Sequence, residues 1–156
     1  MQYPSLTLGV HWRFSQDDWG QRCDAEIFER EHPNEQMPVE CELMNKLNMS
    51  TLAQTLAGYS KGGDVYIAAP PSEWSRIQEL SLVSGDKYDV EVVYGEMLEE
   101  VLATYFGDCE WYKKWKGEIL SLVEQAILSG TDEFMEWLNS SWSGRVRELR
   151  CGVRSK

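Results

Sequence analysis

The chain has 156 residues and a formal net charge of −11, from 26 acidic and 15 basic side chains. A chain of this length is expected to form one domain and to bury an adequate core without disulfides or metal. The composition excludes a disordered or collagen-like protein. No apolar run approaches the roughly 20 residues of a membrane-spanning helix, and the acidic balance argues against direct nucleic-acid binding.

The first half of the sequence predicts β-strands. From Leu6 to Phe14, apolar and polar residues alternate strictly, which is the period of a half-buried strand. Two shorter alternating runs, residues 23–28 and 39–44, are close enough to pair as a hairpin with a longer loop. Residues 65–69 and 88–94 predict two more strands. We therefore expect a mostly antiparallel sheet formed by the N-terminal half.

The last third of the sequence predicts helices. Apolar residues recur with the 3.6-residue period over residues 97–106 and again over residues 108–130, which indicates two amphipathic helices. Thr131 is placed to cap a third helix. Earlier in the chain, Thr51 and Gln54 have the spacing of a capping box and predict a short helix between strands.

Strands first and helices last favour an α+β fold, with the C-terminal helices packed on one face of the sheet. We expect a single α+β domain over residues 1–144. Residues 145–156 carry five basic side chains and lack apolar periodicity, so they predict a basic C-terminal tail that frays or folds back onto the acidic body.

Sequence motifs of catalysis are missing. Gly58–Gly62 matches the G-x-S-x-G pattern of a nucleophile elbow, but the predicted order is helix, turn, strand, and both histidines, His11 and His32, precede the serine. This segment therefore predicts a glycine-rich turn, and His11, on the polar side of the first strand, predicts a surface histidine. Because there is no H-E-x-x-H, no phosphate-binding glycine loop and no close pair of metal ligands, we expect no catalytic residue, no metal and no cofactor.

The cysteines and the N-terminus indicate a cytoplasmic protein. Four cysteines are scattered without a C-x-x-C motif, and we expect all of them to be reduced thiols: Cys23, Cys41, Cys109 and Cys151. The first residues contain no basic segment followed by an apolar one, so we expect no secretory signal.

The predicted hairpin carries an acidic surface. If residues 23–28 and 39–44 pair with their apolar side chains inward, four carboxylates share the outer face: Asp24, Glu26, Glu40 and Glu42. Like charges that face each other across a sheet destabilise it, and a cationic partner would remove that cost. We predict this face as a partner-binding site, with three further residues at its edge: Asp17, Asp18 and Trp19. The alternative is a solvated face that only keeps the protein soluble.

Aromatic residues make up 12% of the chain, including seven tryptophans. Four lie on predicted apolar faces and are expected in the core: Trp12, Trp111, Trp115 and Trp137. Three lie near turns among polar residues: Trp19, Trp74 and Trp142. Because Tyr and Trp are enriched at interface hot spots, exposed aromatics within an acidic surface favour protein binding.

These features together favour an inhibitor of the immunity or antitoxin type, which neutralises a basic protein partner such as a bacterial toxin or nuclease. The alternative within this class is an anti-defence protein that mimics DNA, such as an anti-CRISPR or anti-restriction inhibitor, although the basic tail weakens mimicry. In another class, a small enzyme with a dispersed carboxylate site would be favoured by a cleft with carboxylates of raised pKa. An exposed apolar helix face would favour an adaptor subunit.

Overall fold

A computed structural model describes residues 6–12, 23–37, 41, 48–135 and 140–154. Its elements, in chain order, are β1 (Leu6–His11), α1 (Ala25–Glu31), α3 (Met49–Ser60), β2 (Asp64–Ala68), the 3-10 turn η1 (Pro71–Glu73), α4 (Trp74–Tyr88), β3 (Val92–Tyr94), α5 (Gly95–Phe106), α6 (Glu110–Gly130), β4 (Glu133–Met135) and α7 (Ser141–Arg154). None of the helices in these ranges is long and apolar enough to cross a membrane.

The described strands form one four-stranded sheet in the order β3-β2-β1-β4, and every neighbouring pair is parallel. The chain does combine α and β elements, but the expectation of a mostly antiparallel sheet is wrong. Parallel neighbours need a crossover connection, which α3 supplies between β1 and β2 and α4 supplies between β2 and β3. Helices therefore separate the strands in sequence.

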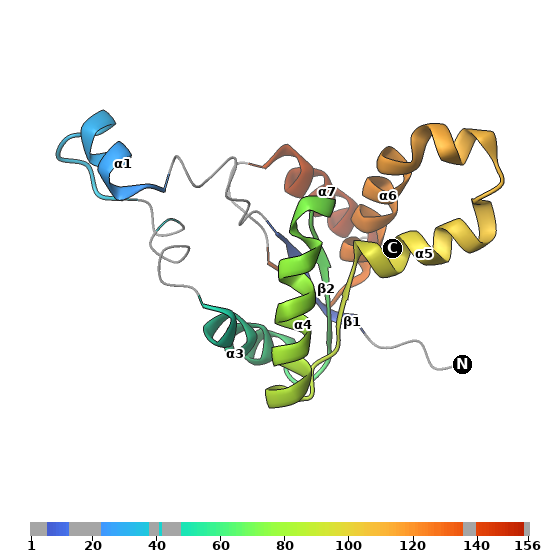
Figure 1. The fold of residues 1–156 in the computed structure, drawn as a ribbon, viewed down its shortest axis with the longest axis horizontal. Coiled ribbons are helices and arrows are strands. Elements are labelled where there is room, and N and C mark those ends of the chain that lie inside the picture. Colours follow the sequence, from blue (N-terminus) through green and yellow to red (C-terminus); the bar gives the residue numbers. More distant parts are fainter. Residues whose placement is uncertain (1–5, 13–22, 38–40, 42–47, 136–139, 155–156) are drawn as a thin grey trace.

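The helices cover both faces of the sheet, not one (Figure 1). The chain moves from β1 to β2 to β3 in one direction and then returns past β1 to β4. Because crossovers keep the same hand, this reversal puts the later helices on the opposite face. The core accordingly has two parts: α3 and α4 pack on one face, and α6 and α7 on the other.

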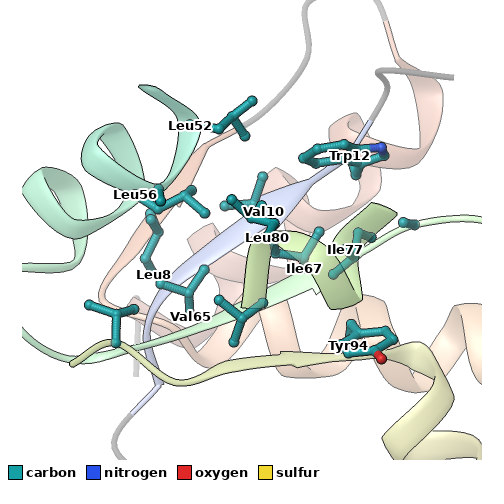
Figure 2. Close-up of a cluster of buried hydrophobic side chains, with 14 residues drawn as sticks. Leu8, Val10, Trp12, Leu52, Leu56, Val65, Ile67, Ile77, Leu80 and Tyr94 are labelled. Carbon is teal, nitrogen blue, oxygen red and sulfur yellow. The ribbon is translucent and has the colours of Figure 1, made fainter. Parts of the chain in front are cut away.

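The larger core cluster lies between the sheet and the pair α3 and α4 (Figure 2). Leu8 and Val10 of β1, and Trp12 directly after it, point to this side as their alternation predicts, and all three are buried. On the other face the close approach of α6 depends on Gly9, where a Cβ atom would lie 2.9 Å from Leu128 Cγ. Each face of β1 is therefore packed against helices.

The strand predicted over residues 23–28 is a helix instead. Asp24 caps α1, because its side chain accepts hydrogen bonds from the backbone N–H groups of Glu26 and Ile27. No residue of α1 is buried, so the alternation there has no sheet face to fill. The partner run at 39–44 lies outside the described residues except for Cys41, and that cysteine forms a disulfide with Cys23. The expectation of four reduced thiols is therefore wrong for this pair.

Two C-terminal predictions are also corrected. The helix expected to begin at Thr131 is replaced by the short strand β4, and Thr131 instead donates its hydroxyl to the carbonyl of Leu128 at the end of α6.

The boundary expected after residue 144 falls inside α7, and most of the expected basic tail is helical. Val146 is fully buried, and the Arg150 guanidinium donates to the carbonyls of Leu128 and Thr131. Basic side chains near a helix C-terminus are favourable, which explains why this basic segment folds.

Other boundaries shift by a few residues. The short helix predicted at Thr51 is α3, which begins at Met49 with Asn48 as its N-cap. The strand predicted over residues 88–94 is confirmed only as β3, since α4 continues to Tyr88. The two long helices predicted over residues 97–106 and 108–130 correspond to α5 and α6.

Candidate functional site at the carboxyl edge of the sheet

All four described strands run in the same direction, so their carboxyl ends meet at one edge of the sheet. In open parallel sheets, ligands bind in crevices outside this edge. A cleft of about 220 Å³ lies at the ends of β1 and β2. It is lined by His11, Ala68, Ala69, Pro70, Pro71, Gly117, Leu120, Ser121, Glu124 and Trp142.

Glu124 is the buried acid of this cleft. It lies on the face of α6 that packs on the sheet, one helical turn from the buried Leu120 and Leu128, and it is 6% exposed. Tyr66, which β2 directs to the same face, donates its hydroxyl to Glu124 Oε1 at 3.0 Å. Burial raises the pKa of Glu124 to about 7, against a smaller opposing effect of the Tyr66 hydrogen bond. Burial, together with the nearby Glu124 charge, also raises the pKa of Tyr66.

A second buried carboxylate shows what Glu124 lacks. Glu73, at the end of η1, accepts hydrogen bonds from Trp12 Nε1 and from the Arg76 guanidinium, which is 3.1 Å away. Glu124 forms no ion pair within the described residues, and neither Lys nor Arg lines its cleft. A buried carboxylate without a counter-charge is costly, so it takes up a proton near neutral pH. It is therefore placed to exchange that proton with a bound molecule.

His11 and Trp142 form one wall of the cleft. The rings of these two residues lie 4.4 Å apart, and His11 Nδ1 is 2.6 Å from the hydroxyl oxygen of Ser143. Trp142 Nε1 donates to the hydroxyl of Ser121 at 2.8 Å, which ties α7 to α6. Ser143 is fully buried, so its hydroxyl positions the imidazole and is not accessible as a nucleophile. The Ser60 of the G-x-S-x-G segment lies elsewhere, buried at the end of α3.

Of the residues predicted for partner binding, the two that the structure describes, Asp24 and Glu26, do not line this cleft. Asp24 and Glu26 are exposed at the start of α1, which lies apart from the sheet (Figure 1). The remaining members of the predicted site fall outside the described residues: Asp17, Asp18, Trp19, Glu40 and Glu42. The pairing of strands that was to bring the carboxylates onto one face does not occur, because residues 25–31 are helical.

Sequence reasoning missed the residues of the cleft. His11 was expected at the surface, whereas it is half-buried at the end of β1 and lies against Trp142 of α7. One signal was present: Leu120, Glu124 and Leu128 follow each other at four-residue spacing, which puts a carboxylate in the middle of a buried helical stripe. Comparisons of the chain with family models, with curated proteins and with solved structures found no match.

Proposed function

We propose that this protein binds a small organic molecule in the carboxyl-edge cleft and exchanges a proton with it through Glu124. The observation that carries this proposal is a buried carboxyl group, without an ion pair among the described residues, whose pKa of about 7 lies in the working range of a general acid or base. The position of the cleft supports it, because ligands of parallel sheets bind at this edge.

The reaction class that fits these groups is acid–base catalysis by a small enzyme with a dispersed site. Glu124 gives or takes the proton, and Tyr66 orients its carboxyl group. His11, whose Nδ1 lies 2.6 Å from the Ser143 hydroxyl, is the second ionisable side chain that lines the cleft. Trp142 provides an apolar wall against which the body of the ligand packs.

A screen of small metabolites by ligand-observed NMR and thermal shift tests this proposal. Glu124→Gln keeps an oxygen to accept the Tyr66 hydrogen bond but removes the titrating group. Glu118→Gln, at an exposed position of the same helix, is the matched control. We expect compounds that bind the wild type to lose affinity with the first variant and to keep it with the second. Compounds that bind both variants equally, or a screen in which none perturbs the Trp142 indole, would contradict the proposal.

We propose the immunity-type inhibitor as a second candidate function, supported by an exposed aromatic surface on a different part of the molecule. The hairpin of α5 and the first half of α6 extends away from the sheet (Figure 1). Four large aromatic side chains are exposed on it: Tyr105, Phe106, Trp111 and Trp115. With a net charge of −11, such a surface suits a basic protein partner.

The test of the second candidate is a pull-down from the native host at low and high salt, with wild type, Tyr105→Ser/Trp111→Ser, and Asp24→Lys/Glu26→Lys. Recovery of a basic protein that both the aromatic variant and high salt abolish would support an inhibitor that uses the hairpin. Loss only with the charge variant would place the contact on α1 instead. Equal recovery with all variants would contradict both surfaces.

The redox state of the cysteines indicates the cellular compartment of the protein. Cytoplasmic location, proposed from the sequence, requires the Cys23 and Cys41 thiols to be reduced, whereas a disulfide between them favours an oxidising compartment. Mass spectrometry after alkylation of the protein in its native host distinguishes the two states, and Cys109, a cysteine outside the disulfide, provides the internal reference.

A further inference from the structure

We infer that the ligand of the carboxyl-edge cleft is a small organic cation, an aliphatic amine in its ammonium form, held by the Glu124 carboxylate against the Trp142 wall. This inference rests on the proposed function and names its class of ligand.

The first support is the buried carboxylate itself. Apart from His11, which lines the same cleft, the described groups around Glu124 carry no full positive charge: Tyr66 from β2 is a neutral phenol, and Gly95 at the start of α5 and the adjacent Trp74 of α4 are uncharged. The start of α5 is close, since a Cβ at Gly95 would lie 3.1 Å from Glu124 Oε1 and 3.0 Å from the Trp74 ring. It contributes only the partial positive charge of a helix N-terminus. A bound ammonium group would supply the missing counter-charge.

The second support is the rest of the lining. Among the described residues that line the cleft, His11 is the one basic side chain, and its ring lies 4.4 Å from that of Trp142 in a tilted arrangement. An indole ring attracts cations through its face, most strongly where water is excluded. The net charge of −11 raises the local concentration of cations and repels anions. A phosphate or carboxylate ligand would therefore meet an unfavourable site.

The size of the cleft limits the ligand. Its volume of about 220 Å³ lies below the roughly 300–1,000 Å³ of sites for drug-sized molecules, so it suits an amine of few carbon atoms. A cation favours the ionised form of Glu124 and displaces its proton. With a pKa of about 7, Glu124 is partly protonated at neutral pH, so binding of a cation should release protons. A neutral ligand that accepts a hydrogen bond from the protonated carboxyl would cause proton uptake instead.

The test compares n-butylammonium with 1-butanol, which has the same size and no charge. Isothermal titration calorimetry at about pH 7 in two buffers of different ionisation enthalpy measures affinity and proton release, and the Trp142 indole resonance in a ¹H–¹⁵N spectrum reports binding in the cleft. We expect n-butylammonium to bind at least tenfold more tightly than 1-butanol, to release protons, and to bind more tightly as the pH rises through 7. Glu124→Gln should lose this tenfold preference, and Glu118→Gln should keep it.

The possible failures are distinguishable. If 1-butanol binds in the cleft as tightly as n-butylammonium, or if binding takes up protons, the inference about the cation is wrong and the proposed function stands. If neither compound perturbs the Trp142 resonance, both the inference and the cleft as a ligand site are contradicted. The pH dependence is measured on the wild type, so the result does not depend on the folding of a variant.

Discussion

Glu124 makes the free energy of unfolding depend on pH in the direction opposite to that of a salt-bridged carboxylate. In the unfolded chain this carboxyl titrates near its ordinary value of 4.5, whereas burial holds the folded-state pKa at about 7. The native state therefore binds more protons between these two values. The corresponding stability is fully present below about pH 4.5 and is lost as the pH rises through about 7.

Replacing Glu124 with Gln should remove this dependence. At about pH 8 we expect Glu124→Gln to be more stable than the wild type by about 3 kcal/mol, at 1.36 kcal/mol for each unit of pKa difference. The difference should shrink towards zero near pH 4.5. Urea denaturation of both proteins across this range measures it, and a stability difference that stays constant with pH would contradict the buried, titrating carboxyl.

Gly9 is a residue of β1 that α6 approaches closely. A Cβ there would lie 2.9 Å from both Leu128 Cγ and Thr131 Oγ1, so Gly9→Ala should lower the free energy of unfolding by about 1–3 kcal/mol through overpacking. Gly58 in α3 is the matched control, because a Cβ there meets nothing within 4 Å. Gly58→Ala should raise stability by about 1 kcal/mol. Similar urea midpoints for the two variants would show that α6 does not pack this closely.

Single residues were predicted correctly from sequence where one physical effect decides their position. Leu8, Val10 and Trp12 are buried because alternation on a strand has only two outcomes. Glu124 could not be assigned in this way, because a charged side chain normally indicates the solvent side of a helix. Functional sites are where such local rules are broken, so the residues that break them are the hardest to predict.

Helix α1 depends on local interactions. It has seven residues, too few to be stable alone in water, and none of them is buried. Two features hold it: the N-cap side chain of Asp24 and the Cys23–Cys41 disulfide, which closes the segment that contains the helix. The stability of α1 should therefore be separate from that of the sheet.

Hydrogen exchange of Cys23→Ser/Cys41→Ser tests this separation. We expect the amides of residues 25–31 to exchange at least tenfold faster than in the wild type, while those of β1 and β2 keep their protection. Cys109→Ser, at a free cysteine, is the control and should change neither region. Faster exchange throughout the sheet would mean that the disulfide supports the whole fold.

The existence of α6 was predicted from sequence, but the face it buries was not. The prediction placed Trp111 and Trp115 in the core, whereas both are about half exposed, and the buried side chains are instead Tyr112, Leu120, Glu124, Gln125 and Leu128. The two stripes differ by one residue, about 100° around the helix, and the charged Glu124 made the truly buried stripe look polar. The backbone at Trp115 is also non-helical, so residues before and after it do not follow one continuous 3.6-residue period.

Because Trp115 is exposed and Trp12 is buried, their replacement with Ala should lower the free energy of unfolding by different amounts. Trp115→Ala should lower the free energy of unfolding by about 1 kcal/mol or less, as other surface substitutions do. Trp12 is 1% exposed, and Trp12→Ala should cost about 3–5 kcal/mol. Chemical denaturation of the two variants measures both values. A cost for Trp115→Ala as large as that for Trp12→Ala would restore the core position that the sequence predicted.

At the scale of the whole molecule, the sequence identified several strands but not how they pair. Alternation describes one strand and its faces, and it does not distinguish a parallel neighbour from an antiparallel one. The decisive error was the hairpin assigned to residues 23–28 and 39–44, because it put neighbouring strands close together in sequence. With residues 25–31 helical, β1 and β2 are separated by more than 50 residues that include α3, and a long connection through a helix is typical of parallel pairing.

The parallel arrangement has a consequence for function. It brings the ends of β1 and β2 together with one face of α6 and the start of α7, four segments that are far apart in sequence. No local motif can report such a site, since His11, Tyr66, Glu124 and Trp142 become neighbours only through the topology. The cleft could therefore be predicted from sequence only after the strand order was known.

The most direct test of this account is the titration of the Glu124 carboxyl carbon by ¹³C NMR in the folded protein without ligand, with Glu124→Gln used to assign the resonance. We predict a midpoint near 7, because the carboxyl group is buried in the cleft beside a neutral phenol. A midpoint near the ordinary value of 4.5 would mean that the group is solvated or paired with a cation, and it would contradict the proposed site.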